Sequence, residues 1–331
     1  MLDTIGERGL LSDVMATETS ISWVPTVQIK LISNPNSGHN RKNPKHIEKL
    51  SQILGDKVDV PRLEDLDSTI EQYKKNQLDI LAVAGGDGTI HQTLSAVHRV
   101  YKKDSWPKIA LLTSGTMNNI ARNVGVRKKT EPQLASIMNT IKRDSPVQTS
   151  IHHPLIFGDD KAGFIFGQGG IPHILEEYEK GGNTSQTKAV LLLTRTIISA
   201  LVNGTFAKKM FAPMEIDILA DGKKQHHTRY TVSVLSSISD VGFGFRPCYA
   251  PLKNPKIAQF VGFTRHPIFT AFCLPKIRLA RPINSKSVQD SLGKEFILKP
   301  TEEMMYTIDG DLYTCTNELN IRVGPAVEFV I

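Results

Sequence analysis

Hydrophobic and polar positions in the first half of the chain follow a repeating order of short apolar runs and amphipathic stretches. Apolar runs that predict buried strands lie at 27–32, 57–60, 78–84 and 108–112. Residues with helical apolar spacing follow these runs at 44–54, at 65–76, from the end of the third run to about residue 101, and from about residue 118. Strand, crossover helix and strand in series imply right-handed connections. The pattern therefore predicts an α/β domain with a parallel sheet.

The pattern changes after about residue 147. Strand-like stretches lie at 161–167, 211–219, 228–236, 295–299, 304–308 and 318–322, with helical patterns at about 171–180, 186–202 and 265–274. This order predicts a second, mainly antiparallel β domain with a few helices. We therefore expect an N-terminal extension (1–25), an α/β domain (26–147) and a β-rich domain (148–331). The final strand is a candidate to return to the first domain.

Three glycine-containing turns follow the predicted strands of the first domain, at 34–38, 85–89 and 114–116. Carboxyl ends of parallel strands meet at one edge of a sheet, which is where such sheets bind ligands. Glycine lets the backbone approach a ligand closely, and the N–H groups at a helix start favour an anion. Asp87 lies within the second turn. It is either a helix cap, a partner of Mg²⁺, or a base for a hydroxyl group.

Charge narrows the class of partner. The chain has a net charge of +7, and its first 25 residues hold four acids and one base, so the remainder carries 39 bases and 29 acids, a net +10. A basic protein suits a nucleotide, a nucleic acid or an anionic lipid surface. No basic-aromatic or arginine-glycine tract is present, so nucleic acid is the weaker of these partners. The sequence leaves the oligomeric state open, a dimer included.

Other features bear on location. The sequence has no apolar run of transmembrane length and no signal-peptide pattern at its start. Its three cysteines (Cys248, Cys273 and Cys315) are widely separated, which is typical of a reducing compartment. We expect a cytoplasmic protein that is able to meet a membrane peripherally. The stretch around 263–272 mixes aromatic and basic residues, and it either docks on a membrane or packs on the β domain, with packing favoured.

Four motifs in this order resemble the diacylglycerol kinase catalytic family, in particular the soluble bacterial-type lipid kinases related to sphingosine and ceramide kinases. The motifs are Asn34-Pro35-Asn36-Ser37-Gly38, Gly85-Gly86-Asp87-Gly88-Thr89, Gly115-Thr116-Met117-Asn118-Asn119 and Asp309-Gly310-Asp311. The resemblance continues through Gly242–Phe245 and Pro251, so that it extends from about residue 26 to the end. It implies two domains, ATP with Mg²⁺, and transfer of the γ-phosphoryl group to the hydroxyl of a lipid such as diacylglycerol or a sphingoid lipid.

The resemblance also implies roles for individual residues. Asp311 is the first choice as general base, with Asp309 and Asp87 as alternatives, and Asp87 is the candidate ligand of Mg²⁺. The implied ATP-binding residues are Asn34, Pro35, Asn36, Ser37, Gly38, His39, Gly85, Gly86, Asp87, Gly88, Thr89, Gly115, Thr116 and Asn119. We expect the three turns to line one wall of a cleft between the domains, with Asp309 and Asp311 approaching it.

Several positions depart from the family pattern. Asn119 and Gln92 are amides where carboxylates are usual, and His91 stands where the family has Asn. Asp311 replaces Glu, and the segment 251–255 lacks an Asp-Gly pair. An amide brings no charge to Mg²⁺, so Asn119→Asp, alone or with Gln92→Glu, is expected to raise activity and to lower the Mg²⁺ that is needed. Two alternatives stay open: a catalytically degenerate nucleotide- or lipid-binding protein, and a nicotinamide-nucleotide kinase, which shares the Gly85–Thr89 motif.

Overall fold

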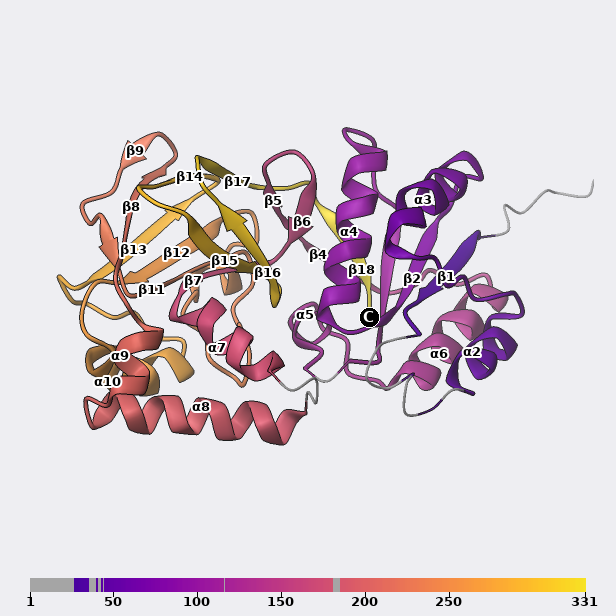
Figure 1. The fold of residues 1–331 in the computed structure, drawn as a ribbon. Helices are drawn as coiled ribbons and strands as arrows, with labels where there is room; N and C mark the ends of the chain where they lie inside the picture. Colours follow the sequence, from indigo (N-terminus) through magenta and orange to yellow (C-terminus); the bar gives the residue numbers. More distant parts are fainter. Residues whose placement is uncertain (1–26, 36–39, 41–42, 44, 116, 181–184) are drawn as a thin grey trace, which may run out of the picture.

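The computed structural model describes residues 27–35, 40, 43, 45–115, 117–180 and 185–331, which form two lobes side by side (Figure 1). The predicted extension 1–25 lies outside the described residues. The first lobe holds β1 (Ile29–Ser33), α2 (His46–Leu54), η1 (Leu63–Asp65), α3 (Leu66–Lys75), β2 (Ile80–Gly85), α4 (Asp87–Tyr101), β3 (Lys108–Thr113), α5 (Asn119–Asn123), α6 (Thr130–Lys142), β4 (Thr149–His152) and β18 (Val327–Val330).

The first lobe is built on a five-stranded sheet in the order β1-β2-β3-β18-β4. The pairs β1–β2, β2–β3 and β3–β18 are parallel, and β4 joins β18 antiparallel. Helices cover both faces, because alternate strand residues point to opposite sides. Leu81 and Ile109 pack with α3 and α4, whereas Ala82 and Ala110 pack with α2 and α6. The α/β architecture and the mostly parallel sheet are thus as predicted.

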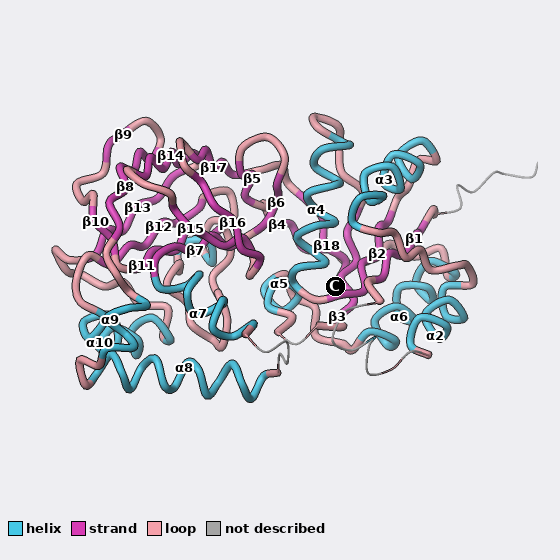
Figure 2. Tube along the Cα trace, viewed as in Figure 1, coloured by secondary structure: helices cyan, strands magenta, loops and turns pink. Residues whose placement is uncertain are grey.

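The second lobe contains two antiparallel sheets with helices on one outer face (Figures 1 and 2). Its strands are β5 (Leu155–Phe157), β6 (Lys161–Gly163), β7 (Ile165–Gly169), β8 (Met214–Ala220), β9 (Lys223–Lys224), β10 (Arg229–Tyr230), β11 (Val232–Ser236), β12 (Ala258–Phe263), β13 (Val288–Gly293), β14 (Glu295–Pro300), β15 (Met304–Ile308), β16 (Asp311–Cys315) and β17 (Leu319–Val323). Its helices are α7 (Gly170–Glu179), α8 (Gln186–Leu201), α9 (Thr205–Met210), η2 (Ala250–Leu252) and α10 (Pro267–Arg278).

The two antiparallel sheets enclose an aromatic core. One sheet has the order β10-β8-β14-β17-β5-β6, with β9 beside β8, and the other has the order β13-β12-β11-β7-β15-β16. Alternation along β12 divides its residues between two cores: Phe260 lies between the sheets, whereas Phe263 lies beneath α10 with Cys273 and Ile277. The mainly antiparallel second lobe confirms the predicted fold class.

Several predicted elements differ from the observed ones. Residues 57–60 form no strand, because only Asp59 bridges β1, opposite Ile32. The stretch 211–219 begins as the end of a helix turn, and its strand starts at Met214. Phe263 belongs to a strand, and the helix predicted around it begins at Pro267. Strands β4 and β18 join the first sheet although they fall within the range 148–331, so the domain boundary remains a prediction.

Candidate active site

The glycine turns lie at the carboxyl ends of β1, β2 and β3, the three neighbouring parallel strands of the first sheet. The second and third turns pack backbone to backbone, since a Cβ atom on Gly115 would lie 2.4 Å from the Cα atom of Gly86. Asn34 links the first turn to the second, because its Nδ2 donates to the Thr89 hydroxyl over 3.2 Å. A side chain at either glycine would separate the turns, so this close approach explains the glycines physically.

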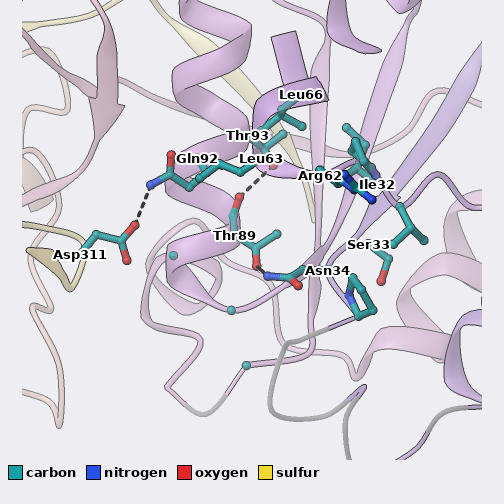
Figure 3. Close-up of a pocket in the computed structure, with 16 residues that line it drawn as sticks. Ile32, Ser33, Asn34, Arg62, Leu63, Leu66, Thr89, Gln92, Thr93 and Asp311 are labelled. Carbon is teal, nitrogen blue, oxygen red and sulfur yellow. Dashed lines mark hydrogen bonds between the residues drawn. The ribbon is translucent and has the colours of Figure 1, made fainter. Parts of the chain in front are cut away.

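These turns border a cavity of about 740 Å³ (Figure 3). Gly86, Gly88 and Gly115 line one part of this cavity, where α4 begins. The segment between α2 and the start of α3 lines another part, with apolar Val60, Leu63 and Leu66 and with Arg62. A helix start with exposed N–H groups favours phosphate, and an apolar wall suits a purine ring.

Asp87 is held by the start of α5. Its Oδ2 accepts the Asn119 N–H over 3.0 Å, and its Oδ1 accepts the Ile120 N–H over 3.1 Å. The carboxylate therefore satisfies two N–H groups that a helix start leaves without intrahelical partners. Burial raises the pKa of Asp87 above its ordinary value, while these two N–H groups and the charge of Arg122 oppose the rise. Asp87 thus joins the second turn to the third.

Asp309 and Gly310 form a two-residue hairpin turn between β15 and β16. Their φ angles are 52° and 102°, as a tight hairpin of this kind requires. The carboxylate of Asp309 accepts the N–H groups of Phe164 and Ile165 at 2.9–3.0 Å. Burial raises its pKa well above the ordinary value, and the nearby Asp87 and Asp311 raise it further, against those two N–H groups. This anchoring fixes the turn against β7.

Asp311 reaches from the second lobe to the second glycine turn (Figure 3). A Cβ atom on Gly88 would lie 2.9 Å from its Oδ1. Its Oδ2 accepts a hydrogen bond from Gln92 Nε2 over 2.8 Å. No described residue hydrogen-bonds to Oδ1 of Asp311, whereas both oxygens of Asp87 and Asp309 are occupied by backbone donors. Of the three carboxylates, Asp311 has the most capacity to accept a proton from a ligand.

His91 and Tyr313 extend this contact into a directed network. The Nδ1 atom of His91 lies 2.8 Å from the carbonyl oxygen of Ala162, which only accepts, so Nδ1 carries the proton. Burial lowers the pKa of His91 and favours its neutral form. Nε2 then accepts from the Tyr313 hydroxyl over 2.8 Å, and that hydroxyl oxygen accepts from Gln92 Nε2 over 3.2 Å. Gln92 therefore donates to both Tyr313 and Asp311.

The amide at position 119 also has a defined structural contact. Asn119 Nδ2 donates to the carbonyl oxygen of Asp240 over 2.9 Å, and its Oδ1 accepts from Arg122 over 3.2 Å. Asn123 donates to the same carbonyl oxygen over 2.8 Å. These bonds tie α5 of the first lobe to the loop after β11 in the second lobe. Both amides that replace the usual carboxylates thus have hydrogen-bond partners, since Gln92 and Asn119 each donate a hydrogen bond from the first lobe to the second.

A second cavity, of about 280 Å³, lies on the other side of the Asp309–Asp311 turn. Its polar end is formed by Asp87, Asn119, Asp309 and Gly310. The remainder of its wall is mostly apolar and comes from α5 and the residue Met117 before it, from β7, α7, α8, β11 and β15, and from the loop before η2. The apolar lining residues are Met117, Ile120, Ile165, Ile171, Leu175, Leu193, Val234, Val241, Phe243 and Phe245. Such a cavity suits an apolar ligand with a polar group at one end.

Part of the predicted nucleotide site lies outside the described residues, namely Asn36, Ser37, Gly38, His39 and Thr116. Among the implied residues that are described, Asn34, Pro35, Gly86, Gly88, Thr89 and Gly115 line the first cavity, together with Asp311. Asn119, Asp87 and Asp309 line the second cavity instead. Gly85 lies in β2, where a Cβ atom would meet the Thr89 side chain at 2.4 Å.

The sequence motifs did not predict some of the residues at the candidate site. Arg62 and Leu63 follow an ordinary loop, and Tyr313 is one of several aromatics in β-rich sequence. Only the pairing of β16 with β15 brings Tyr313 toward α4. Residues 61–66 read Pro-Arg-Leu-Glu-Asp-Leu, a composition with no feature that marks them as a wall of the first cavity.

The side chains at the candidate site are poorly suited to hold Mg²⁺ in the absence of a nucleotide. Within the described parts of the chain, no group of three His, Cys, Asp or Glu side chains is arranged to hold a metal. Asp87, the candidate ligand, already binds two N–H groups, and the positions of two further acids are amides. Mg²⁺ usually binds proteins through one or two carboxylates together with substrate phosphates. The residues present are therefore suited to a metal that arrives with its nucleotide.

The first lobe is an α/β domain with glycine turns at the carboxyl ends of its parallel strands, and the second lobe is β-rich. Residues 28–149 match the family described as "Diacylglycerol kinase catalytic domain". This match confirms the predicted resemblance within residues 28–149, which hold three of the four motifs. No curated protein matches the chain.

Solved structures show the same fold over nearly the whole chain. A diacylglycerol kinase from Bacillus anthracis str. Sterne has a TM-score of 0.62 at 14% identity, covering 92% of this chain and 96% of its own. Two further structures from that organism, assigned to the diacylglycerol kinases, have TM-scores of 0.66 and 0.65 at 16% and 14% identity, with the same coverage. At this identity the comparison establishes the fold alone.

Proposed function

We propose that this protein is an ATP-dependent lipid kinase, which transfers the γ-phosphoryl group of MgATP to the hydroxyl of a lipid such as diacylglycerol or a sphingoid lipid. The observation that carries the proposal is the pair of cavities on either side of one hairpin turn. Asp311 lines the cavity with the glycine turns, and Asp309 and Gly310 line the apolar cavity. A phosphate donor and an apolar acceptor would therefore meet at this turn.

The first cavity supports nucleotide binding. The start of α4, with Gly86, Gly88 and Gly115 beside it, would offer backbone N–H groups to phosphate. Val60, Leu63 and Leu66 offer an apolar surface to the adenine ring, and Arg62 adds a positive charge. MgATP enters as the substrate, with Mg²⁺ held largely by its phosphates.

The second cavity supports a lipid acceptor. Acyl or alkyl carbons would contact Ile171, Leu175 and Leu193, and the hydroxyl group would lie at the end near Asp309 and Gly310. A nicotinamide nucleotide has a polar acceptor, which this mostly apolar wall would bind poorly. The cavity therefore favours a lipid over a nicotinamide nucleotide.

Asp311 is the proposed general base. In the transfer, the acceptor oxygen bonds to the γ-phosphorus, the bond from that phosphorus to the β,γ-bridging oxygen breaks, and the hydroxyl proton passes to Asp311 as ADP leaves. The transition state of such transfers is loose, so the proton moves late and a carboxylate suffices. Gln92 holds Oδ2 of Asp311, and its Oδ1 faces Gly88. The roles first considered for Asp309 and Asp87 are better explained as positioning, since backbone donors hold both carboxylates.

A labelled-phosphate assay tests the proposal. The protein is incubated with γ-labelled ATP and a panel of lipids in mixed micelles, with Mg²⁺ or EDTA, and lipid products are separated by chromatography. We expect a labelled lipid that requires Mg²⁺, and a loss of at least about 100-fold in kcat for Asp311→Asn with little change in nucleotide binding. The matched control is Asp290→Asn, because Asp290 contacts Tyr249 and Gln259, remote from both cavities.

The second candidate function is binding without turnover. It is favoured by the two amides, Gln92 and Asn119, which place no charge where the family has carboxylates. Under this alternative, ATP raises the melting temperature but no lipid is labelled, and Asp311→Asn changes neither result. A labelled lipid that depends on Asp311 would instead exclude it.

A further inference from the structure

Helix α8 is apolar on both of its faces. Leu192, Thr196 and Ala200 are buried on its inner side. Its outer side exposes Val190, Leu191, Ile198 and Leu201, and Val202 follows it, at exposed fractions of 42–70%. These positions fall on one helical face, as residues spaced by three, four, seven or eight do. An exposed apolar surface is unfavourable in water, and on a folded protein it indicates a site that binds another molecule or a membrane.

Two stretches of the chain that include α8, α9 and α10 are basic and contain no acid, whereas the neighbouring α7 carries three Glu residues. Residues 185–214, which form α8 and α9, contain four Lys or Arg and no Asp or Glu. Residues 241–289, which include α10, contain eight Lys or Arg and again no acid, although the whole chain has 33 acids. Among the described residues, none of these twelve bases forms an ion pair. Lys188 and Arg195 act on Glu177 of the neighbouring α7, and the charge of the other ten bases is left for an external anion.

The three helices lie together on one side of the second lobe. α8 packs against both α9 and α10, and it runs along the outer edge of this lobe, away from the strands (Figure 1). α10 adds Phe272, which is 71% exposed, and Leu279 follows at 62%. Exposed Lys208 and Lys209 of α9, and Lys276 and Arg278 of α10, contribute the charge. Apolar and cationic side chains thus share these helices.

The same helix reaches the apolar cavity. Leu193 of α8 lines that cavity with Ile171 and Leu175 of α7, while Leu191 and Ile198 point outward. One helix therefore connects an exposed apolar surface to the proposed acceptor site. A lipid that enters the cavity from a bilayer would pass beside this helix.

We propose that α8, α9 and α10 form a docking surface for an anionic lipid bilayer. Exposed Leu, Ile, Val and Phe side chains would enter the boundary between headgroups and acyl chains, and the bases would bind anionic headgroups. The biological use of this surface rests on the proposed lipid kinase function. A second copy of the chain fits less well, because a two-fold interface brings the same acid-free, basic surface against itself.

Vesicle sedimentation without ATP or acceptor lipid tests docking separately from catalysis. The unmodified protein is mixed with phosphatidylcholine vesicles that contain no anionic lipid or about 30% phosphatidylserine. We expect binding to the anionic vesicles at about 0.15 M salt and its loss at about 1 M salt. Lys208→Gln with Lys209→Gln should weaken the partition coefficient roughly 10-fold or more.

The apolar contribution is tested by Leu191→Ser with Ile198→Ser, which should weaken vesicle binding at least about 10-fold. The matched control is Ile151→Ser on β4, since Ile151 is 56% exposed and Ile198 is 55% exposed. That control should bind vesicles like the unmodified protein. Kinase activity on a short-chain acceptor dispersed in detergent should be unchanged in both variants, which shows that they are folded.

The outcomes separate docking from the proposed function. Equal binding to neutral and anionic vesicles, or equal loss in the Ile151→Ser control, overturns the docking surface even if the protein phosphorylates dispersed lipid. A dimer in sedimentation velocity that Leu191→Ser with Ile198→Ser dissociates, with no vesicle binding, assigns the face to a second copy and overturns the proposal. Salt-sensitive vesicle binding without any kinase activity supports the surface and overturns the proposed function instead.

Discussion

Replacing Gln92 by glutamate should reduce activity at neutral pH, although it restores the residue type usual in the family. Gln92 Nε2 donates to Asp311 Oδ2 over 2.8 Å, so the substitution exchanges a donor for a second carboxylate. Two charges about 4 Å apart repel by about 4 kcal/mol near a protein surface. Both side chains are partly buried, and the solvent that still reaches them screens this repulsion to about 2 kcal/mol. This reverses the expectation drawn from the family pattern.

The repulsion between Asp311 and the glutamate introduced at position 92 can be relieved by protonation or by displacement of Asp311. A repulsion of about 2 kcal/mol is equivalent to raising the pKa of the introduced carboxyl from about 4.3 to about 6. Above that pH the repulsion displaces Asp311, and kcat/KM should fall roughly 10- to 30-fold, as about 2 kcal/mol predicts. Below it, a protonated carboxyl again donates to Asp311. The ratio of variant to unmodified activity should therefore rise as the pH falls from 8 to 5.5.

The assay is a pH profile of lipid phosphorylation, with Gln92→Met as the control that removes the hydrogen bond without adding charge. Gln92→Met should lower kcat/KM by about 5-fold at every pH, since it loses a hydrogen bond to a charged group and creates no repulsion. The reasoning is refuted if Gln92→Glu matches or exceeds the unmodified protein between pH 7 and 8. A pH-independent loss equal to that of Gln92→Met would also refute it.

Three further predictions follow from the same contacts. Burial lowers the pKa of His91 in the folded protein, so this histidine takes up its proton first in the unfolded chain as the pH falls below 6.5, and the free energy of unfolding decreases toward acid pH. In urea unfolding, His91→Gln should remove up to about 1.4 kcal/mol per pH unit of this decrease, whereas the exposed control His226→Gln should leave it unchanged. Gly115→Ala, whose Cβ would lie 2.4 Å from the neighbouring turn, should abolish the rise in melting temperature caused by MgATP, whereas Gly86→Ala, with 3.3 Å, should only reduce it. Asn119→Asp should lower the free energy of unfolding by about 1–3 kcal/mol, because a carboxylate facing a backbone carbonyl cannot donate; an increase in stability would contradict this.

The proposed docking surface on α8, α9 and α10 could be predicted only in part from the sequence. The sequence shows that residues 185–214 and 241–289 contain no Asp or Glu. Which apolar residues face outward required the structure, because apolar residues lie on both the buried and the exposed sides of α8. None of the described helices has the length and hydropathy that crossing a bilayer requires.

Local sequence determined the elements whose causes are local. The apolar runs of β2 and β3 are buried on both faces, so their strand character is written as continuous hydrophobicity. The glycine turns were evident because close approach and helix starts need particular residue types. These features sufficed for the α/β class and for the glycine-lined part of the first cavity. Short strands such as β4 and β16 lack such patterns, because their stability comes from partners far away in the chain.

Only the tertiary structure decided what the carboxylates and amides do. Asp87 was read as a cap, a metal ligand or a base, and the α5 backbone that occupies both its oxygens is more than thirty residues away. Gln92 and Tyr313 are separated by 221 residues, yet they share a hydrogen bond. Sequence chemistry says what a side chain can donate or accept, whereas long-range packing selects its partner. The sequence therefore identified the carboxylates and amides as candidate site residues, and the contacts between the two lobes determine which partners they bind.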